Sequence, residues 1–236
     1  MVKQITRVVA PVRQQAVEIL RQAIADHVLR PGMRLIERDL CETLQVSRAA
    51  LREGLRQLEA EGLLTRDARG RLIVAPITLE QARGIYETRA ALEGLAGRLF
   101  AERASDEEIA KLRETFDLLE EAAHEDTLSR FLQVKDGFYE ILLNGCRNDE
   151  LRTLLNLLYW RITLLRVTSL SEPGRLEQCL EEFRRIVEAA ERRDASALER
   201  CCIAHVDCAR EAALRILEKR LATSPDGVLA SATRQD

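Results

Sequence analysis

The stretch LQVSRAALREGLRQLEAEGLL, residues 44–64, constrains the fold more than any other part of the sequence. Ser47 is a favourable N-cap and Gly62 stands where a helix usually ends, so these two residues bound a predicted helix of about four turns. One face of this helix carries the leucines at positions 51, 55 and 58, which need a core. Arg48 and Arg52 lie one turn apart on another face, just after the N-terminus. The pattern predicts a helix with a packed side and a cationic leading end.

Short elements on both sides of this helix predict a small domain. Residues 12–29 carry apolar side chains, Ile19 and Val28 among them, at helical spacing, and a short helix follows Pro31-Gly32 at 38–44. Two apolar runs flank RDARGR and predict a β-hairpin with glycine at its tip. These runs are Leu63–Thr65 and Leu72–Val74. Three helices and such a wing make a winged helix-turn-helix, which we place at residues 1–77.

The charges favour nucleic acid as the partner of this domain alone. Residues 1–77 hold 13 Lys and Arg against 9 Asp and Glu, whereas the remainder holds 23 against 30. The second helix of a helix-turn-helix enters the major groove N-terminus first, and arginine suits both guanine and phosphate. We therefore expect Arg48 and Arg52 to contact DNA, and Ser47 with its backbone N–H groups to add a phosphate contact. The alternative, a merely solvated helix face, is disfavoured by the elements around it.

From Thr78 onward every strong signal is helical. Thr78 with Gln81 and Ser105 with Glu108 form capping boxes that start two helices, and Asp194 is placed to cap the last one. The predicted helices span 78–103, 105–123, 127–144, 148–169, 175–192 and 195–221. They predict an all-α, six-helix domain at residues 78–221. Residues 222–236 have little apolar periodicity and predict a disordered tail.

Composition and motifs exclude several classes of protein. No window approaches the length of apolar sequence that a membrane span needs, so no membrane association is expected, and the N-terminus lacks the apolar core of a signal peptide. Six cysteines without a CxxC pair predict reduced thiols in a cytoplasmic protein. The sequence has no HExxH, GxSxG, P-loop or dinucleotide motif, and it offers only 3 histidines for acid–base or metal chemistry. An enzyme is therefore not expected.

The segment PGMRLIERDLCETLQVSRAALREGLRQLEAEGLL, together with RGRLIVAP, resembles the winged helix of the GntR family of bacterial transcription regulators. The resemblance covers residues 12–77. In the fatty-acid-responsive branch of that family, three arginines and the wing tip contact the operator. The resemblance implies this role for Arg38, Arg48 and Arg52, and for the wing tip Arg69-Gly70-Arg71.

The helical part resembles the FCD effector domain of the same family, which implies a small-molecule effector and a homodimer. The similar stretches are IYETRAALEGLAGRLFAERAS (85–105), FYEILLNGCRNDELRTLL (138–155) and RRIVEAAERRDASALERCCIAH (184–205). Many such domains bind a divalent metal through an Asp, a His four residues later and two further His. Those positions hold Lys135, Tyr139, Phe183 and His205 here, and the first three cannot replace the usual ligands. We therefore expect no metal and no other cofactor.

The cysteines leave a second arrangement open. Cys201, His205 and Cys208 recur at helical spacing, and Cys179 lies four residues before Phe183. These side chains could face one cavity and bind a soft metal or sense oxidation. The commoner alternative is that the cysteines are small buried core residues.

Without a metal, the carboxylate of an effector needs cations from the protein. Arg89 is one such cation, or alternatively a buried partner of Glu93. The candidates are four cations and three residues that map to the same pocket: Arg89, Lys135, Arg161, Arg166, Tyr139, Phe183 and His205. We predict a dimeric repressor that binds a double-stranded inverted-repeat operator and is controlled by a small organic acid. The alternative is a ligand-free architectural DNA-binding protein.

Overall fold

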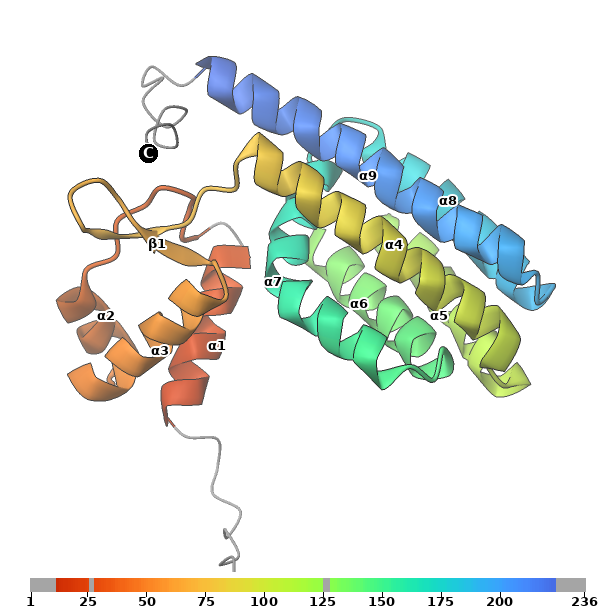
Figure 1. The fold of residues 1–236 in the computed structure, drawn as a ribbon, viewed down its shortest axis with the longest axis horizontal. Helices are drawn as coiled ribbons and strands as arrows, with labels where there is room; N and C mark the ends of the chain where they lie inside the picture. The colour runs from red at the N-terminus through yellow and green to blue at the C-terminus, as the bar shows by residue number, and fades with distance from the viewer. Residues whose placement is uncertain (1–11, 26–27, 125–127, 224–236) are drawn as a thin grey trace, which may run out of the picture. The chain divides into compact units, whose positions relative to one another are not determined.

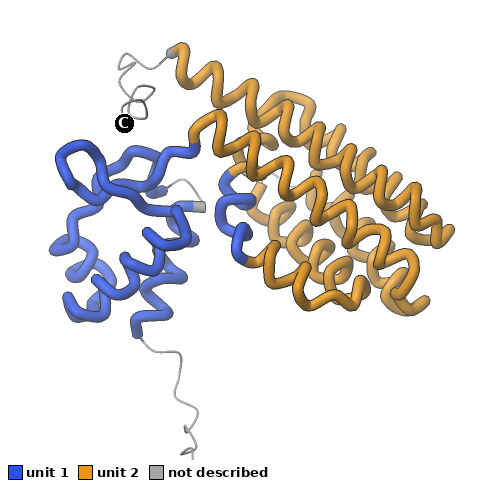
Figure 2. Tube along the Cα trace, viewed as in Figure 1, with its two compact units in different colours: residues 1–77, 157–164 blue, residues 78–156, 165–236 orange. Residues whose placement is uncertain are grey.

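The computed structural model describes residues 12–25, 28–124 and 128–223. Within these ranges the chain forms nine helices and one two-stranded sheet (Figure 1). The elements are α1 (Val12–Ala25), α2 (Glu37–Leu44), α3 (Arg48–Ala60), β1 (Leu64–Arg66), β2 (Leu72–Val74), α4 (Leu79–Arg103), α5 (Asp106–Ala123), α6 (Leu128–Gly145), α7 (Asp149–Leu170), α8 (Arg175–Glu191) and α9 (Ala195–Thr223). They divide into two compact units, residues 1–77 with 157–164 and residues 78–156 with 165–236 (Figure 2).

The first unit is built around α3. The side chain of Ser47 accepts a hydrogen bond from the backbone N–H of Ala50 at 3.2 Å, which confirms the predicted N-cap. The predicted leucine face is also confirmed, because Leu51, Leu55 and Leu58 are all buried. These leucines share one core with α1, β1 and β2.

The sheet begins one residue later than the sequence predicted. Gly62 has a φ of 73°, and the N–H of Leu63 bonds the carbonyl of Leu58 at 3.0 Å, so Leu63 closes the end of α3 instead of entering a strand. The antiparallel pair then runs from Leu64 opposite Val74 to Arg66 opposite Leu72. At the wing tip, Gly70 adopts a φ of 72°, the left-handed conformation that glycine tolerates without strain.

The predicted apolar face of α1 is wrong at Ile19 and at Val28. Ile19 is 54% exposed, whereas Val17 is buried and packs on Gly54, where a Cβ would lie 2.8 Å from Val17 Cγ2. The apolar face of α1 is therefore shifted towards Val17 relative to the prediction, and the backbone of α3 approaches it at Gly54. The helix ends at Ala25, residues 26–27 lie outside the described ranges, and Val28 is exposed.

The second unit contains α4 to α9 except residues 157–164 of α7, and both predicted capping boxes are present at the starts of α4 and α5. The side chain of Asp194 accepts from the N–H of Ala197 at 2.9 Å, so the predicted cap of α9 is confirmed as well. α4 and α9 lie side by side (Figure 1). Two glycines allow this approach, since a Cβ on Gly94 would lie 2.7 Å from Ile203 and one on Gly97 would lie 2.7 Å from Cys202.

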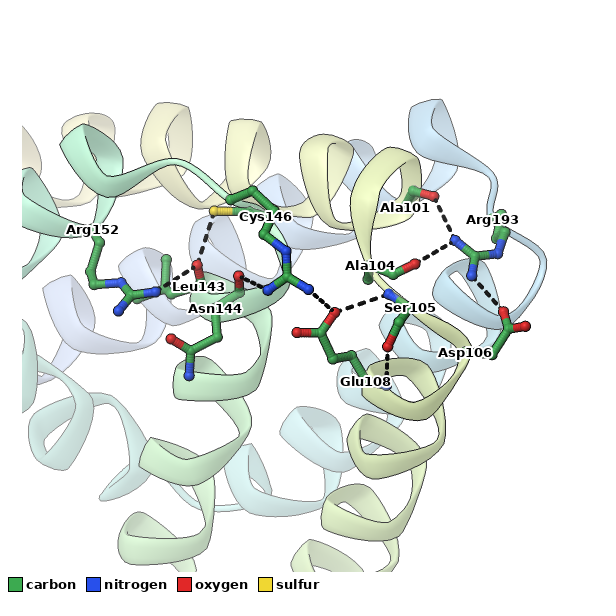
Figure 3. A network of polar contacts seen from close by, with 11 residues as sticks. Ala101, Ala104, Ser105, Asp106, Glu108, Leu143, Asn144, Cys146, Arg152 and Arg193 are labelled. Atoms are coloured by element: carbon green, nitrogen blue, oxygen red, sulfur yellow. Dashed lines mark hydrogen bonds and ion pairs between the residues drawn. The ribbon is translucent and has the colours of Figure 1, made fainter.

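One end of this unit is closed by arginines that cap helix ends (Figure 3). Arg193 donates to the carbonyl of Ala104 at 2.8 Å and pairs with Asp106 at 2.5 Å. Arg147 pairs with Glu108 at 2.8 Å, and Glu108 also accepts from the N–H of Ser105. These contacts join the ends of α4, α6 and α8 to the start of α5, and they fix the bundle that holds the site described below.

These observations confirm the predicted fold class, mostly α with a three-helix winged unit and a six-helix all-α unit. The predicted disordered tail, residues 222–236, lies outside the described residues from position 224 onward, and α9 continues to Thr223. None of the helices in the described part of the chain is both long and apolar enough to span a membrane.

Candidate functional site

The leading end of α3 presents the first group of predicted site residues. Arg48 and Arg52 are both exposed, and the Nε of Arg52 donates to Glu37 of α2 at 2.8 Å. This ion pair brings the first turns of α3 to the start of α2, where Arg38 is exposed and bonded to Asp39 at 3.1 Å. Arg38, Ser47, Arg48 and Arg52 therefore gather where α2 and α3 begin. Their N–H groups and charges suit phosphate and the acceptor edge of guanine.

The wing tip is a separate exposed turn. The carboxylate of Asp67 accepts from the backbone N–H groups of Arg69 and Arg71, both at 2.9 Å, and from the side chain of Arg71. The side-chain bond from Arg71 lowers the pKa of Asp67, followed by the backbone bonds. Asp67 therefore fixes the conformation of the turn around Gly70, and the side chain of Arg69 stays exposed. Such a turn can place one arginine in a groove or on a phosphate.

A second group lies inside the six-helix unit, in what we call the buried cluster. Five helices contribute charged, aromatic or thiol side chains to it. Its members are Arg89 and Glu93 of α4, Lys135, Asp136 and Tyr139 of α6, Arg166 of α7, Arg175, Cys179, Glu182 and Phe183 of α8, and His205 of α9. The predicted residues Arg89, Lys135, Tyr139, Phe183 and His205 are thus brought together.

Arg89 links two helices at the centre of the cluster. Its Nε donates to Glu93 at 2.5 Å, so the alternative role as a buried ion-pair partner is observed. Its Nη2 donates to the hydroxyl of Tyr139 at 2.9 Å, and Arg166 stacks on the same ring with its Cζ 4.3 Å from the centroid. Burial and the nearby Glu93 raise the pKa of Tyr139, so the hydroxyl keeps its proton as a donor. Within the part of the chain that the structure describes, Arg89 Nη1 has no hydrogen-bond partner.

Lys135 and His205 face each other across Phe183. The ammonium of Lys135 lies 3.4 Å from the Sγ of Cys179 and 5.1 Å from the centroid of Phe183, whose ring lies 4.8 Å from that of His205. Burial, followed by the charge of Lys135 and of the neighbouring arginines, holds the pKa of His205 well below its usual value. The imidazole is therefore neutral at pH near 7.

Glu182 and Arg175 belong to the cluster but were missed in the sequence. Glu182 lies 2.6 Å from the Nδ1 of His205 and accepts from Arg175 at 2.8 Å. A carboxylate at Nδ1 keeps the imidazole proton there, so Nε2 carries a lone pair, and this atom has no partner. Both residues share the buried face of α8 with Cys179 and Phe183. Charged residues on an otherwise apolar helix face were the sequence signal that could have identified them.

Arg161 does not join the cluster, so that prediction is corrected. It lies in the segment 157–164, which groups with the first unit, and its Cδ would lie 3.7 Å from a Cβ placed on Gly62. Arg166, which was also predicted, lies five residues later on α7 and belongs to the cluster, where it pairs with Asp136 at 2.7 Å.

The cluster does not fit the divalent metal of similar domains. Lys135, Tyr139 and Phe183 stand at three of the four ligand positions, and an ammonium repels a cation. A different trio, Cys179, Glu182 and His205, places its ligand atoms within 4.8 Å of one another. The ammonium of Lys135 already contacts that sulfur at 3.4 Å, and the charge of Arg175 contacts Glu182. These charges oppose a metal ion on the trio.

Protein purified without added metal is therefore expected to contain well under one zinc or nickel ion per chain, and a chelator is expected to leave its melting temperature unchanged. Elemental analysis and thermal unfolding with and without chelator measure this. A stoichiometric metal whose removal strongly lowers the melting temperature would show that Cys179, Glu182 and His205 bind it despite Lys135.

A cavity of about 380 Å³ opens between α8 and α9. Its lining residues are Gln178, Glu181, Glu182, Arg185, Ala197, Arg200, Cys201, Ala204, His205 and Cys208. Glu182 and His205 belong both to this wall and to the buried cluster. The cavity therefore borders the cluster at these two residues.

Two family models match the chain. One described as "Bacterial regulatory proteins, gntR family" covers residues 12–74, and one described as "FCD domain" covers residues 84–208. The first match coincides with the helix-turn-helix and wing, and the second contains every residue of the buried cluster.

Individual proteins agree with these matches. The uncharacterized HTH-type transcriptional regulator YdhC of Bacillus subtilis (strain 168) is 30% identical over 201 residues, which cover 85% of this chain and 90% of that protein. The HTH-type transcriptional repressor RspR of Escherichia coli (strain K12) is 26% identical over 210 residues, which cover 89% and 92%. Among solved structures, E. coli McbR/YncC shares the fold with a TM-score of 0.73 at 21% identity, over 90% of this chain and 99% of that one.

Proposed function

The chain belongs to the GntR family of bacterial transcription regulators and carries an FCD effector-binding domain, and from this premise we propose that it is a homodimeric repressor released by a small organic acid. Regulators of this family bind DNA, and FCD domains bind small molecules. The chain is therefore a transcription regulator and not an enzyme. The operator, the direction of control, the dimer and the class of effector are the parts that we propose.

In the proposed complex with the operator, the leading end of α3 lies in the major groove. Arg48 and Arg52 then contact base edges or phosphates. Arg38 and Ser47 contact the backbone, and the wing tip Arg69-Gly70-Arg71 contacts an adjacent groove. A twofold dimer presents two such surfaces, which match an inverted repeat. The similarity to a protein named a repressor supports repression as the direction of control.

For the effector, one observation supports the proposal: the buried cluster contains four buried cations, and three of them have N–H groups with no hydrogen-bond partner among the described residues. These cations are Arg89, Lys135, Arg166 and Arg175, and the unpartnered atoms are Arg89 Nη1, Arg166 Nε, Arg175 Nε and Arg175 Nη1. Buried donors without acceptors are costly, and a carboxylate supplies several acceptor sites at once. This feature favours an effector-controlled protein over a ligand-free architectural one.

Ligand control requires that the acid bind two states of the dimer with different affinities. Lys135→Ala or His205→Ala is expected to abolish the response of operator affinity to the acid while leaving operator affinity itself unchanged, because the winged unit carries the DNA contacts. A thermal-shift screen of organic acids identifies the ligand, and fluorescence anisotropy on an operator fragment measures the response. Lys111→Ala, on the exposed face of α5, is the matched control.

One pattern of results would show that the acid binds at another site. If both variants respond to the acid as the wild type does, whereas Arg89→Ala does not, the acid binds elsewhere in the helical unit and the roles of Lys135 and His205 are wrong.

A further inference from the structure

The cavity between α8 and α9 is lined by charges of both signs, and only Glu182 and His205 of the buried cluster belong to its wall. The wall holds two arginines, Arg185 and Arg200, and two glutamates, Glu181 and Glu182. Because His205 is neutral, the charges of the wall sum to zero. A ligand that carries both a negative and a positive group is complementary to such a wall, whereas a simple anion or cation matches only half of it.

The positive end of the cavity lies around Cys201. Burial raises the pKa of the Cys201 thiol, and the charges of Arg185 and Arg200 oppose that rise, so both guanidinium groups lie near the sulfur. Arg185 already pairs with Glu181 at 3.3 Å. Arg200 is exposed, and within the described part of the chain no carboxylate lies at ion-pair distance from it. Arg200 can therefore pair with the carboxylate of a ligand without losing an existing partner.

The negative end of the cavity is formed by Glu182 beside His205. The Oε2 of Glu182 accepts from Arg175 at 2.8 Å and lies 2.6 Å from the Nδ1 of His205, whereas Oε1 has no hydrogen-bond partner among the described residues. The Nε2 of His205, which carries a lone pair, also lacks one there. The charge of Glu182 and these two acceptors favour a cationic hydrogen-bond donor at this end, such as an ammonium group.

The two ends are separated by small side chains. Along α9, Arg200 and His205 are five residues apart, which corresponds to about 7.5 Å at about 1.5 Å per residue. Ala204 and the thiols of Cys201 and Cys208 line the wall on the same helix. The volume of about 380 Å³ lies at the small end of the range for ligand pockets, about 300–1,000 Å³. The cavity thus suits a small ligand whose opposite charges are separated by a short chain.

We propose that the cavity between α8 and α9 binds a small amino acid whose carboxylate and ammonium are separated by a short chain. The carboxylate pairs with Arg200 and the ammonium lies at Glu182. This site is separate from the one proposed for the organic acid in the buried cluster, and it does not require that an acid bind there. Because Glu182 and His205 belong to both the cavity wall and the cluster, occupancy of the cavity acts on the cluster through these two residues.

Three ligands with the same chain test this proposal: 4-aminobutanoate, butanoate and butylamine, each titrated into the full chain by calorimetry at about pH 7. The wild type is expected to bind 4-aminobutanoate at least about tenfold more tightly than either of the others. Arg200→Met is expected to weaken the binding of 4-aminobutanoate by about tenfold and to leave that of butylamine unchanged. Arg192→Met removes an exposed arginine that is not part of the cavity wall, and it should behave as the wild type does.

Ala204→Leu tests the location of the site without changing a charge. Ala204 is an exposed residue of the cavity wall, so a leucine there should fill part of the cavity and abolish the binding of 4-aminobutanoate. The melting temperature and the operator affinity should stay unchanged. Lys135→Ala, inside the cluster, should keep the binding of 4-aminobutanoate, which distinguishes this site from the acid site.

Three results would overturn the inference. Equal affinities for 4-aminobutanoate and butanoate would show that the ammonium has no partner in the protein. Binding of 4-aminobutanoate that persists in both Arg200→Met and Ala204→Leu would place it outside the cavity. The absence of binding at about 10 mM would show that the cavity takes no amino acid of this kind. None of these results bears on the organic acid, whose test is the response of operator affinity in Lys135→Ala.

Discussion

Replacing Arg48 and Arg52 together by alanine is expected to lower operator affinity by about 30-fold to about 10⁴-fold, since each lost base or phosphate contact of this kind costs about 1–3 kcal/mol. Both side chains are exposed at the leading end of α3 and neither is part of the core, so folding should be unaffected. Arg52 is held by Glu37, which orients its guanidinium before DNA is bound. Fluorescence anisotropy with an operator fragment measures the loss.

The two single variants separate the kinds of contact. A variant that loses a base contact also loses discrimination at that base, whereas one that loses a phosphate contact weakens all sequences equally and lowers the salt dependence. Arg113→Ala, on the helical unit, is the control for loss of one partly exposed arginine. Wild-type affinity in the double variant would mean that α3 is not the reading helix.

Glu93→Ala is expected to lower the free energy of unfolding of the helical unit by about 3–5 kcal/mol, because it leaves Arg89 as an uncompensated buried charge. Arg89 is 1% exposed and Glu93 is 3% exposed, so water cannot replace the lost partner. Chemical denaturation followed by circular dichroism measures the change.

Two further variants separate the effect of burial from the effect of losing an ion pair. Glu191→Ala breaks the Arg113–Glu191 pair, an exposed contact at 2.7 Å that joins α5 to α8, and it should cost about 1 kcal/mol or less. The double variant Arg89→Met, Glu93→Met removes both charges and should recover much of the stability. A loss below about 1 kcal/mol for Glu93→Ala would show that the pair is hydrated and that the cluster is not a low-dielectric site.

Local signals in the sequence predicted the helix boundaries well. Capping depends on residues three apart, so Ser47, Thr78 and Ser105 could be read directly. The start of β1 could not be predicted in this way, because it depends on whether Leu63 closes α3 or enters the strand. An apolar run is compatible with either arrangement. The exposure of Ile19 likewise follows from the close approach of α1 to Gly54, which helical spacing alone does not fix.

Members of the buried cluster were predicted where the family resemblance gave their positions. They were missed where their role depends on residues of another helix. Lys135, Tyr139 and Phe183 converge because their positions correspond to ligands of one metal in similar domains. Arg175 and Glu182 sit on an otherwise apolar face of α8, and their role appears only when His205 of α9 is placed beside them. Arg161 was misplaced because part of α7 groups with the first unit.

We propose that an organic acid bound in the helical unit controls operator affinity, and a closed binding cycle decides whether it does. The operator Kd is measured with and without a saturating concentration of the acid found by thermal shift, and the Kd of the acid is measured with and without operator. Both constants are expected to change by the same factor, at least tenfold or about 1.4 kcal/mol. An operator Kd that is the same with and without saturating acid would contradict it.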